Sequence, residues 1–292
     1  MIPKRTIEEV LVRYKLEPTI REVFVEGVFD RDLYKWFLKK MGLSSVKVYP
    51  ISSVDVGFET LSKYALTSGE RQRVIAFARE AASSGVSPAV MVCVIDSDLD
   101  YILGVNDNCP LLVRTDGTSA ELLAWRYDVL ERFCIMVLGS DKPDEIIANL
   151  FAVESLVCDV FVLRAALAKL SMEWRLIDID ILFDRRNPIT FEEYCKRVAN
   201  KNGDHKGLEA VLDCLVSIRD TNAKSLPAPQ RMHGHDLMEA ARKVLQNLRF
   251  DHGCLGDGLD FSRTLMANLE WENVQADSVI NSFRMLGHRA DS

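Results

Sequence analysis

Two apolar runs that end abruptly in a carboxylate limit the fold more than any other feature of this chain. Residues 23–25 run directly into Glu26, and residues 90–95 run directly into Asp96. Runs that are apolar at every position are typical of parallel strands buried on both faces of a sheet. Ligands of open α/β sheets bind beyond the carboxyl ends of the strands, so the sequence predicts a binding edge that holds both acids.

Strand and helix signals alternate through the first half of the chain. Strands are expected at residues 21–25, 46–49, 89–95 and 111–113, and helices at residues 30–41 and 69–82. The first helix has the spacing of an apolar face, beginning at Leu33, and stops at Gly42. Strands separated by crossover helices predict an α/β fold with a small, mainly parallel sheet and flanking helices.

The second half of the chain has a mostly helical pattern. Helices are expected at residues 144–170, 190–201, 206–219, 236–249 and 259–269. Residues 176–183 fit either a strand or a helix. We therefore expect two domains: residues 1–138 with the parallel sheet, and residues 139–292 as a mostly helical C-terminal region.

Composition sets the outer limits. The chain has 292 residues, 48% of them hydrophobic and 27% charged, which is ordinary for a soluble globular protein. No wholly apolar run approaches the roughly 18 residues of a membrane span, so no membrane is expected as a partner. Seven cysteines without a CxxC pair favour reduced thiols and a cytoplasmic protein. The net charge of −7 argues against a protein that coats nucleic acid, although a local basic track is compatible with it.

The segment Asp96-Ser97-Asp98, with Asp100 close behind, points to a metal site. If strand geometry continues past residue 95, Asp96 and Asp98 share one face of the sheet. Mg²⁺ or Mn²⁺ suits carboxylate ligands, and Mg²⁺ usually takes only one or two of them, with water and phosphate completing its shell. A simple turn at the strand end is the alternative interpretation, because Asp and Ser are common in turns.

Glu26 is followed by Gly27, which we expect to let the backbone turn sharply beside a ligand. Near a bound cation, Glu26 would ligate it or move a proton during attack on a phosphodiester. Taken alone, Glu26 is better explained as an exposed turn residue. The partnership with Asp96 reverses that preference, so we take Glu26, Asp96 and Asp98 as the catalytic, metal-binding set.

Besides Asp100, three residues are second-rank candidates. Asp116 and Glu121 follow the fourth expected strand, so both are expected at the same edge of the sheet. Thr118 and Glu121 also have the spacing of a capping box, which would give Glu121 a structural role. His235 belongs to a loop that we expect to reach over the acidic site and touch phosphate.

The surroundings of His235 allow two further interpretations. Asp236 has the position of a helix N-cap. Two pairs, His233 with His235 and His252 with Cys254, contain the residue types of a zinc site, but their spacing matches no strong zinc signature.

Basic side chains gather in two places. Five of them are RNA-binding candidates: Arg185, Arg186, Lys196, Arg197 and Lys201. A second group falls beside the expected sheet: Arg71, Arg73 and Arg79. A track for a nucleic-acid backbone is one explanation, and a solvated helix face is the other.

A Glu-Gly pair after an early strand and an Asp-x-Asp after a later one, within a small parallel sheet, resemble the Toprim fold of topoisomerases, primases and OLD-type nucleases. The resemblance covers roughly residues 20–135. It implies that Glu26 is the Toprim glutamate and that Asp96 and Asp98 are its metal-binding pair, with Mg²⁺ or Mn²⁺ as the cofactor.

A wider similarity is carried by four parts of the chain: residues 24–27 with Asp32 and Tyr34, residues 95–98, residues 115–122 and residues 232–237. Together they resemble the Toprim effector nucleases of PARIS anti-phage systems. This resemblance implies an effector that an ABC-type ATPase sensor holds inactive, and that forms a homodimer on release and cuts host tRNA. The helical region is then expected to bind RNA or a partner.

Three other functions are compatible with parts of the sequence. Val-Ile-Asp-Ser-Asp also looks like the Asp-x-Asp with which glycosyltransferases hold Mn²⁺ and a nucleotide sugar, although that class does not need Glu26. A phosphatase of the haloacid dehalogenase type would have Thr or Val where Asp100 stands. A non-catalytic module whose acidic cluster docks a basic partner is the third alternative.

Overall fold

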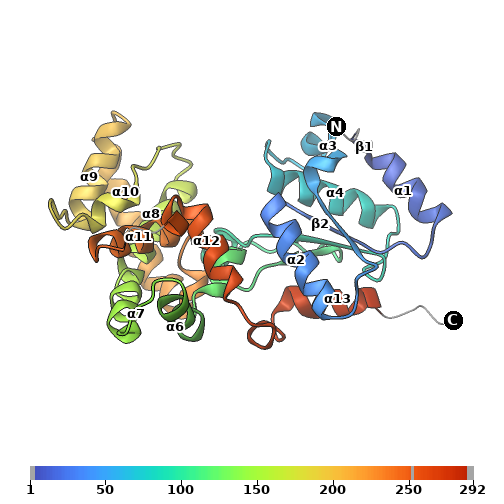
Figure 1. Cartoon of the computed structure of the whole chain (residues 1–292). Helices are drawn as coiled ribbons and strands as arrows, with labels where there is room; N and C mark the ends of the chain where they lie inside the picture. Colours follow the sequence, from blue (N-terminus) through green and yellow to red (C-terminus); the bar gives the residue numbers. More distant parts are fainter. Residues whose placement is uncertain (1–3, 251–252, 288–292) are drawn as a thin grey trace. The chain divides into compact units, whose positions relative to one another are not determined.

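The computed structural model describes residues 4–250 and 253–287. Its contacts divide the chain into two compact units: the first holds residues 1–97, 106–116 and 271–292, and the second holds residues 98–105 and 117–270 (Figure 1). We expected a single boundary near residue 138. The contacts instead group the C-terminal segment with the N-terminal one, because a unit is defined by its packing rather than by chain order.

A parallel sheet forms the centre of the first unit. In spatial order its strands are β3 (Lys47–Pro50), β2 (Glu22–Val25), β5 (Met91–Ile95) and β6 (Leu112–Arg114). Each neighbouring pair is parallel. β2 and β5 are buried at every position, as the apolar runs 23–25 and 90–95 predict, and the burial includes Glu22 at the start of β2. The α/β fold with a mainly parallel sheet is confirmed, and each expected strand agrees with the observed one to within two residues at either end.

Helices flank this sheet (Figure 1). They are α1 (Ile7–Leu16), α2 (Val28–Lys40), α3 (Phe58–Lys63), α4 (Glu70–Ser83) and α13 (Ser278–Gly287). Phe24 and Cys93 share a buried core with α1 and α4, and the rings of Phe24 and Phe77 meet edge to face at 4.7 Å between centroids. α2 and α13 lie together outside this core, where the rings of Tyr34 and Phe283 meet at 5.6 Å.

Sequence analysis did not predict α1 or α13. The start of α1 is a capping box, in which the Glu9 backbone N–H donates to the Thr6 hydroxyl and the Thr6 N–H donates to the Glu9 carboxylate. Glu22 of β2 is fully buried and accepts hydrogen bonds from Arg13 and Tyr14, which ties α1 to the sheet. Four short elements complete the unit: β1 (Arg5–Thr6) paired with β4 (Val54–Asp55), and the 3₁₀ turns η1 (Ile51–Ser53) and η7 (Trp271–Asn273).

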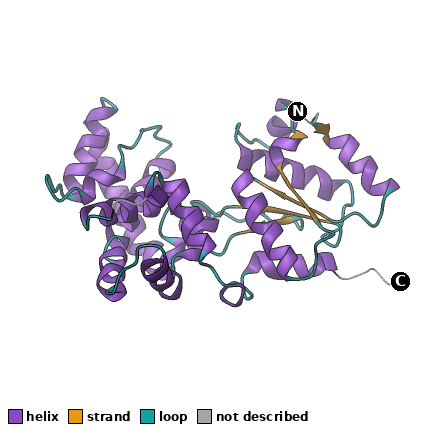
Figure 2. Cartoon of the chain, viewed as in Figure 1, coloured by secondary structure: helices purple, strands orange, loops and turns teal. Residues whose placement is uncertain are grey.

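The described residues of the second unit form helices and 3₁₀ turns, with no strand (Figure 2). The helices are α5 (Asp100–Leu103), α6 (Tyr127–Met136), α7 (Pro143–Phe151), α8 (Glu154–Lys169), α9 (Phe191–Lys201), α10 (Gly207–Thr221), α11 (Gly234–Asn247) and α12 (Gly258–Ala267). The 3₁₀ turns are η2 (Ala120–Ala124), η3 (Ile179–Phe183), η4 (Ala223–Ser225), η5 (Ala228–Gln230) and η6 (Gly253–Leu255). The expected helical region is confirmed, but the helix expected at residues 144–170 is interrupted after Phe151.

The stretch Pro143–Lys169, which spans α7 and α8, is long and apolar enough to cross a membrane by length and composition. The stretch is not an uninterrupted apolar run, because Glu154 and Asp159 lie within it. Within the fold, 50% of the most apolar window of this stretch is buried, and α8 packs against α10 and α11. A core helix of a globular unit passes the same test, so the stretch is weak evidence for a membrane span.

Candidate active site

Glu26 and Asp96 lie side by side in the first unit. Each is the first residue after its strand, and β2 and β5 are adjacent and parallel, with Phe24 in register with Cys93. The Glu26 side chain crosses to the neighbouring strand, where its Oε1 accepts a hydrogen bond of 2.9 Å from the Asp96 backbone N–H. Both residues are half-buried. Two acids far apart in the sequence thus meet at the carboxyl edge of the sheet.

Neighbouring residues hold the end of β5 in place. The Ser97 N–H donates to the Thr115 hydroxyl at 3.1 Å, and the Ser97 hydroxyl donates to the Thr115 carbonyl at 2.6 Å. Both side chains are buried, and they join the segment that follows β5 to the one that follows β6. On the other side, Arg71 donates from Nε to the Asp96 carbonyl at 3.2 Å. The sequence offered no local signal for the Ser97–Thr115 contact, since its partners are 18 residues apart.

Gly27 does not act as we expected. Its backbone is extended, with φ of −123°, so no sharp turn requires a glycine there. It is the N-cap of α2, and its N–H donates to the Asp30 carboxylate at 2.9 Å. Glu26 therefore directly precedes the N-terminus of a 13-residue helix, an end whose partial positive charge favours a nearby carboxylate.

Asp98 and Asp100 belong to the second unit, since the division falls between Ser97 and Asp98. β5 ends at Ile95, and Asp98 has a positive φ of 42°, a left-handed conformation that Asp tolerates better than most residues. The expectation that strand alternation places Asp96 and Asp98 on one face is therefore wrong. Chain connectivity alone keeps the Cα atoms of these two residues within about 7 Å.

In the second unit, the structure brings Glu121 and His235 together. Glu121 is buried, His235 is exposed, and Glu121 Oε1 lies 4.0 Å from His235 Nε2. The capping box expected at Thr118 is absent: Ser119 is the N-cap of η2 and makes no side-chain cap bond. The Thr118 hydroxyl instead donates to the Met232 carbonyl, which fastens the Glu121 segment to the segment before His235.

Asp236 is an anchor within the fold rather than a helix cap. His233 is the N-cap of α11, and Asp236 accepts two hydrogen bonds from the Arg164 guanidinium, of 2.9 and 2.8 Å. Burial alone would raise the pKa of Asp236, but its interactions with His233 and Arg164 together hold that pKa below its usual value.

Within residues 4–250 and 253–287, no three His, Cys, Asp or Glu side chains form a group that would hold a metal ion. This finding gives no support to a zinc site around His235, and His252 lies outside the described residues. Glu26 and Asp96 are a pair of oxygen donors. A pair suits Mg²⁺, which takes most of its ligands from water and substrate phosphate, better than a closed protein site.

Asp116 has a partner that sequence analysis missed. Its Oδ2 accepts from the Ser278 N–H at 3.0 Å, and Asp277 beside it accepts from the Val279 N–H at 2.9 Å. Both acids thus lie at the N-terminus of α13. Burial, followed by the charge of Asp116, raises the pKa of Asp277 to about 6. The contact joins residues 162 positions apart, beyond the reach of any local pattern.

The RNA-binding candidates are exposed, and several of them are paired within the second unit. Lys196 and Arg197 form ion pairs with Glu192 and Glu193, one turn earlier on α9, at 2.7 and 3.0 Å. Lys201 donates to the Leu176 carbonyl at 2.9 Å. Arg185 and Arg186 lie in the exposed loop before α9. In the first unit, Arg73 and Arg79 are paired with Glu70 and Asp107.

No protein-family model matches the chain, and no curated protein matches it at a significant level.

Proposed function

We propose that this protein is an endoribonuclease of the Toprim type that depends on Mg²⁺ or Mn²⁺. One observation carries the proposal: Glu26 and Asp96, 70 residues apart, meet at the ends of adjacent parallel strands, with 2.9 Å between Glu26 Oε1 and Asp96 N. The order of the two acids and their strand context are those of the Toprim resemblance. Phosphodiester cleavage is the chemistry that such a carboxylate pair supports best.

We assign the cation to Glu26 and Asp96, and the Toprim resemblance implies Asp98 as a further ligand. Bound there, it would contact the scissile phosphate and stabilise the negative charge that develops on it. Glu26 would also hold or move a proton at the attacking or leaving oxygen.

The biological role that we propose follows from the resemblance to PARIS effectors. The substrate is host tRNA, whose single-stranded loops expose the backbone and splay the bases. An ABC-type ATPase sensor holds the chain inactive in the cytoplasm, and the released chain acts as a homodimer that stops translation.

The test of the cleavage site is the variant Glu26→Gln. A glutamine keeps an oxygen that accepts the Asp96 N–H, so the local fold is retained while the negative charge is lost. With purified tRNA and Mg²⁺, E26Q and D96N should each cut at least about a hundredfold more slowly than the wild type. The matched control is E59Q, which removes an exposed acid on α3 of the same unit and should leave the rate unchanged.

Sequencing of RNA 5′ and 3′ ends from cells that express each variant locates the cut. Cleavage at the wild-type rate by both E26Q and D96N would refute the proposed site. A parallel incubation with Mn²⁺ and a mixture of UDP-sugars tests the glycosyltransferase alternative, and sugar transfer there without RNA cleavage would replace the proposal.

A further inference from the structure

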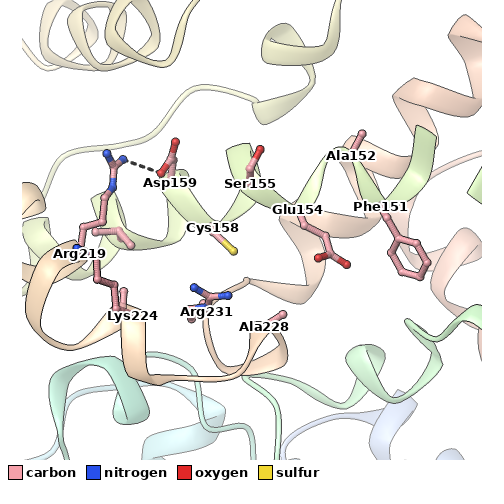
Figure 3. Close-up of a pocket in the computed structure, with 12 residues that line it drawn as sticks. Phe151, Ala152, Glu154, Ser155, Cys158, Asp159, Arg219, Lys224, Ala228 and Arg231 are labelled. Atoms are coloured by element: carbon pink, nitrogen blue, oxygen red, sulfur yellow. Dashed lines mark hydrogen bonds and ion pairs between the residues drawn. The ribbon is translucent and has the colours of Figure 1, made fainter. Parts of the chain in front are cut away.

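A pocket of about 530 Å³ lies within the second unit, bounded by the start of α8, the end of α10 and residues 223–231 (Figure 3). Its volume is in the range of sites that bind small molecules. Figure 3 shows Arg219 and Lys224 toward one end and Phe151 toward the other, with Arg231 and Cys158 between them. The pocket thus has a cationic end and an end with an aromatic ring.

Two guanidinium groups that line the pocket, Arg219 and Arg231, have a nitrogen without an acceptor. The Nε atoms of Arg219 and Arg231 are both buried and have no hydrogen-bond partner among the described residues. Arg219 donates from Nη2 to Asp159 at 2.6 Å, but Arg231 forms no ion pair with any described carboxylate. The two Nε atoms are themselves inaccessible, so the part of Arg231 that a ligand would meet is the rest of its guanidinium, which no described carboxylate pairs.

The cations that line the pocket differ in whether a carboxylate of the chain already pairs with them. Three cations, Arg219, Lys224 and Arg231, face two acids, Glu154 and Asp159. Asp159 forms an ion pair with Arg219. Glu154 accepts a hydrogen bond of 2.8 Å from the Trp125 indole. Lys224 is likewise paired with Asp220 at 2.8 Å, so Arg231 is the lining cation that forms no ion pair with a described carboxylate. A guanidinium binds phosphate oxygens well, because its parallel N–H groups match their spacing.

We propose that this pocket binds a nucleotide through its phosphate ester. The phosphate contacts Arg231 and Arg219, with Lys224 at the exposed rim, and the base lies toward Phe151. The half-buried ring of Phe151 packs edge to face on Trp125 at 5.9 Å, which holds it in place as a surface for a flat base. The phosphate ester belongs either to a free mononucleotide or to a nucleotide of an RNA strand. The inference does not depend on cleavage at Glu26 and Asp96.

Calorimetric titration of the full chain tests the proposal in buffer with EDTA, so that no cleavage occurs. The two probes are AMP and a five-nucleotide RNA with a 5′-phosphate. The wild type should bind at least one probe, and Arg231→Gln should weaken that binding at least about tenfold, as loss of a charged hydrogen bond implies. The matched control is R263Q, an exposed arginine on α12 of the same unit that does not line the pocket and should leave the affinity unchanged.

A second measurement uses the wild-type protein, so it tests nucleotide binding in the pocket even if R231Q does not fold. The Cys158 thiol lines the pocket, and burial raises its pKa to about 11 against the opposing effect of Arg231. A bound nucleotide should slow its alkylation by a maleimide, read by peptide mass spectrometry, at least about threefold by occluding the thiol. The half-buried Cys109 of the first unit is the internal control and should react at an unchanged rate.

The outcomes separate the sources of the phosphate. Binding of AMP supports a free nucleotide, and binding of the RNA alone supports a strand of nucleic acid. Equal affinities of the wild type and a folded R231Q would overturn the proposal, and so would the absence of both heat and Cys158 protection at millimolar probe. A chain that binds a probe here but cuts no RNA would refute only the cleavage function.

Discussion

Asp277 is a buried acid with another acid at its side. It accepts backbone hydrogen bonds from Val279 and Ile280, while burial and the charge of Asp116 raise its pKa to about 6. The unfolded chain would titrate near the ordinary aspartate value of about 4. The folded state therefore binds a proton more tightly than the unfolded state. This stabilisation is complete below the unfolded pKa and is lost as the pH rises through the folded pKa.

The variant Asp277→Asn should remove this pH dependence. Asparagine keeps an oxygen that accepts from the Val279 N–H but carries no charge at any pH. Relative to the wild type, D277N should therefore gain about 2 kcal/mol in free energy of unfolding between pH 4 and pH 7. Urea denaturation at several pH values measures the difference. D55N, at an exposed acid on β4, should follow the wild type, and a D277N profile parallel to the wild type would refute the raised pKa.

At the scale of an element, the local sequence was sufficient to predict where α2 ends. Gly42 follows the helix with a φ of 77°, its N–H donates to the Lys39 carbonyl, and the Leu43 N–H donates to the Leu38 carbonyl. These two bonds form a Schellman motif, in which the left-handed position favours glycine. The stop that the sequence predicts at Gly42 is confirmed.

Gly42→Ala should lower the free energy of unfolding by about 1 kcal/mol, because a Cβ disfavours the left-handed conformation. A Cβ at position 42 would meet no atom within 4 Å, so the loss reports backbone strain rather than a clash. Gly57 is the matched control: its space is equally open and its φ is −71°. G57A should change stability by no more than about 0.5 kcal/mol. Equal losses from both substitutions in urea denaturation would exclude the conformational explanation.

Other elements could not be predicted from the sequence, because their partners are distant. The apolar runs of β2 and β5 were sufficient to identify both strands, because burial on both faces leaves a local signature in the sequence. They thereby predicted that Glu26 and Asp96 lie at one edge of the sheet. The capping box at Thr118 failed because its hydroxyl bonds to Met232, 114 residues later. Strand alternation failed at Asp98 because β5 ends at Ile95, and an apolar run does not reveal how the following turn is bent.

At the scale of the whole molecule, the first unit is assembled from both ends of the chain. Its sheet and the helices α1 to α4 come from residues before 117, whereas α13 comes from the C-terminal segment. α13 buries Val279, Ile280 and Phe283, and it contacts β5 and β6. The candidate pair Glu26 and Asp96 thus lies in a unit whose packing requires residues from the far end of the sequence.

Phe283→Ala tests this dependence. Phe283 is fully buried against Tyr34 of α2, so its truncation should cost about 3 to 5 kcal/mol of unfolding free energy. M285A removes a large side chain from the same helix at a position that is 44% exposed, and it should cost no more than about 0.5 kcal/mol. Hydrogen exchange in β5 and β6 locates the effect, since loss of α13 packing should speed exchange there.

A fragment of residues 1–138 lacks α13 altogether and should not unfold cooperatively. A cooperative transition in that fragment, or an F283A cost as small as that of M285A, would mean that the N-terminal segments form the unit without α13.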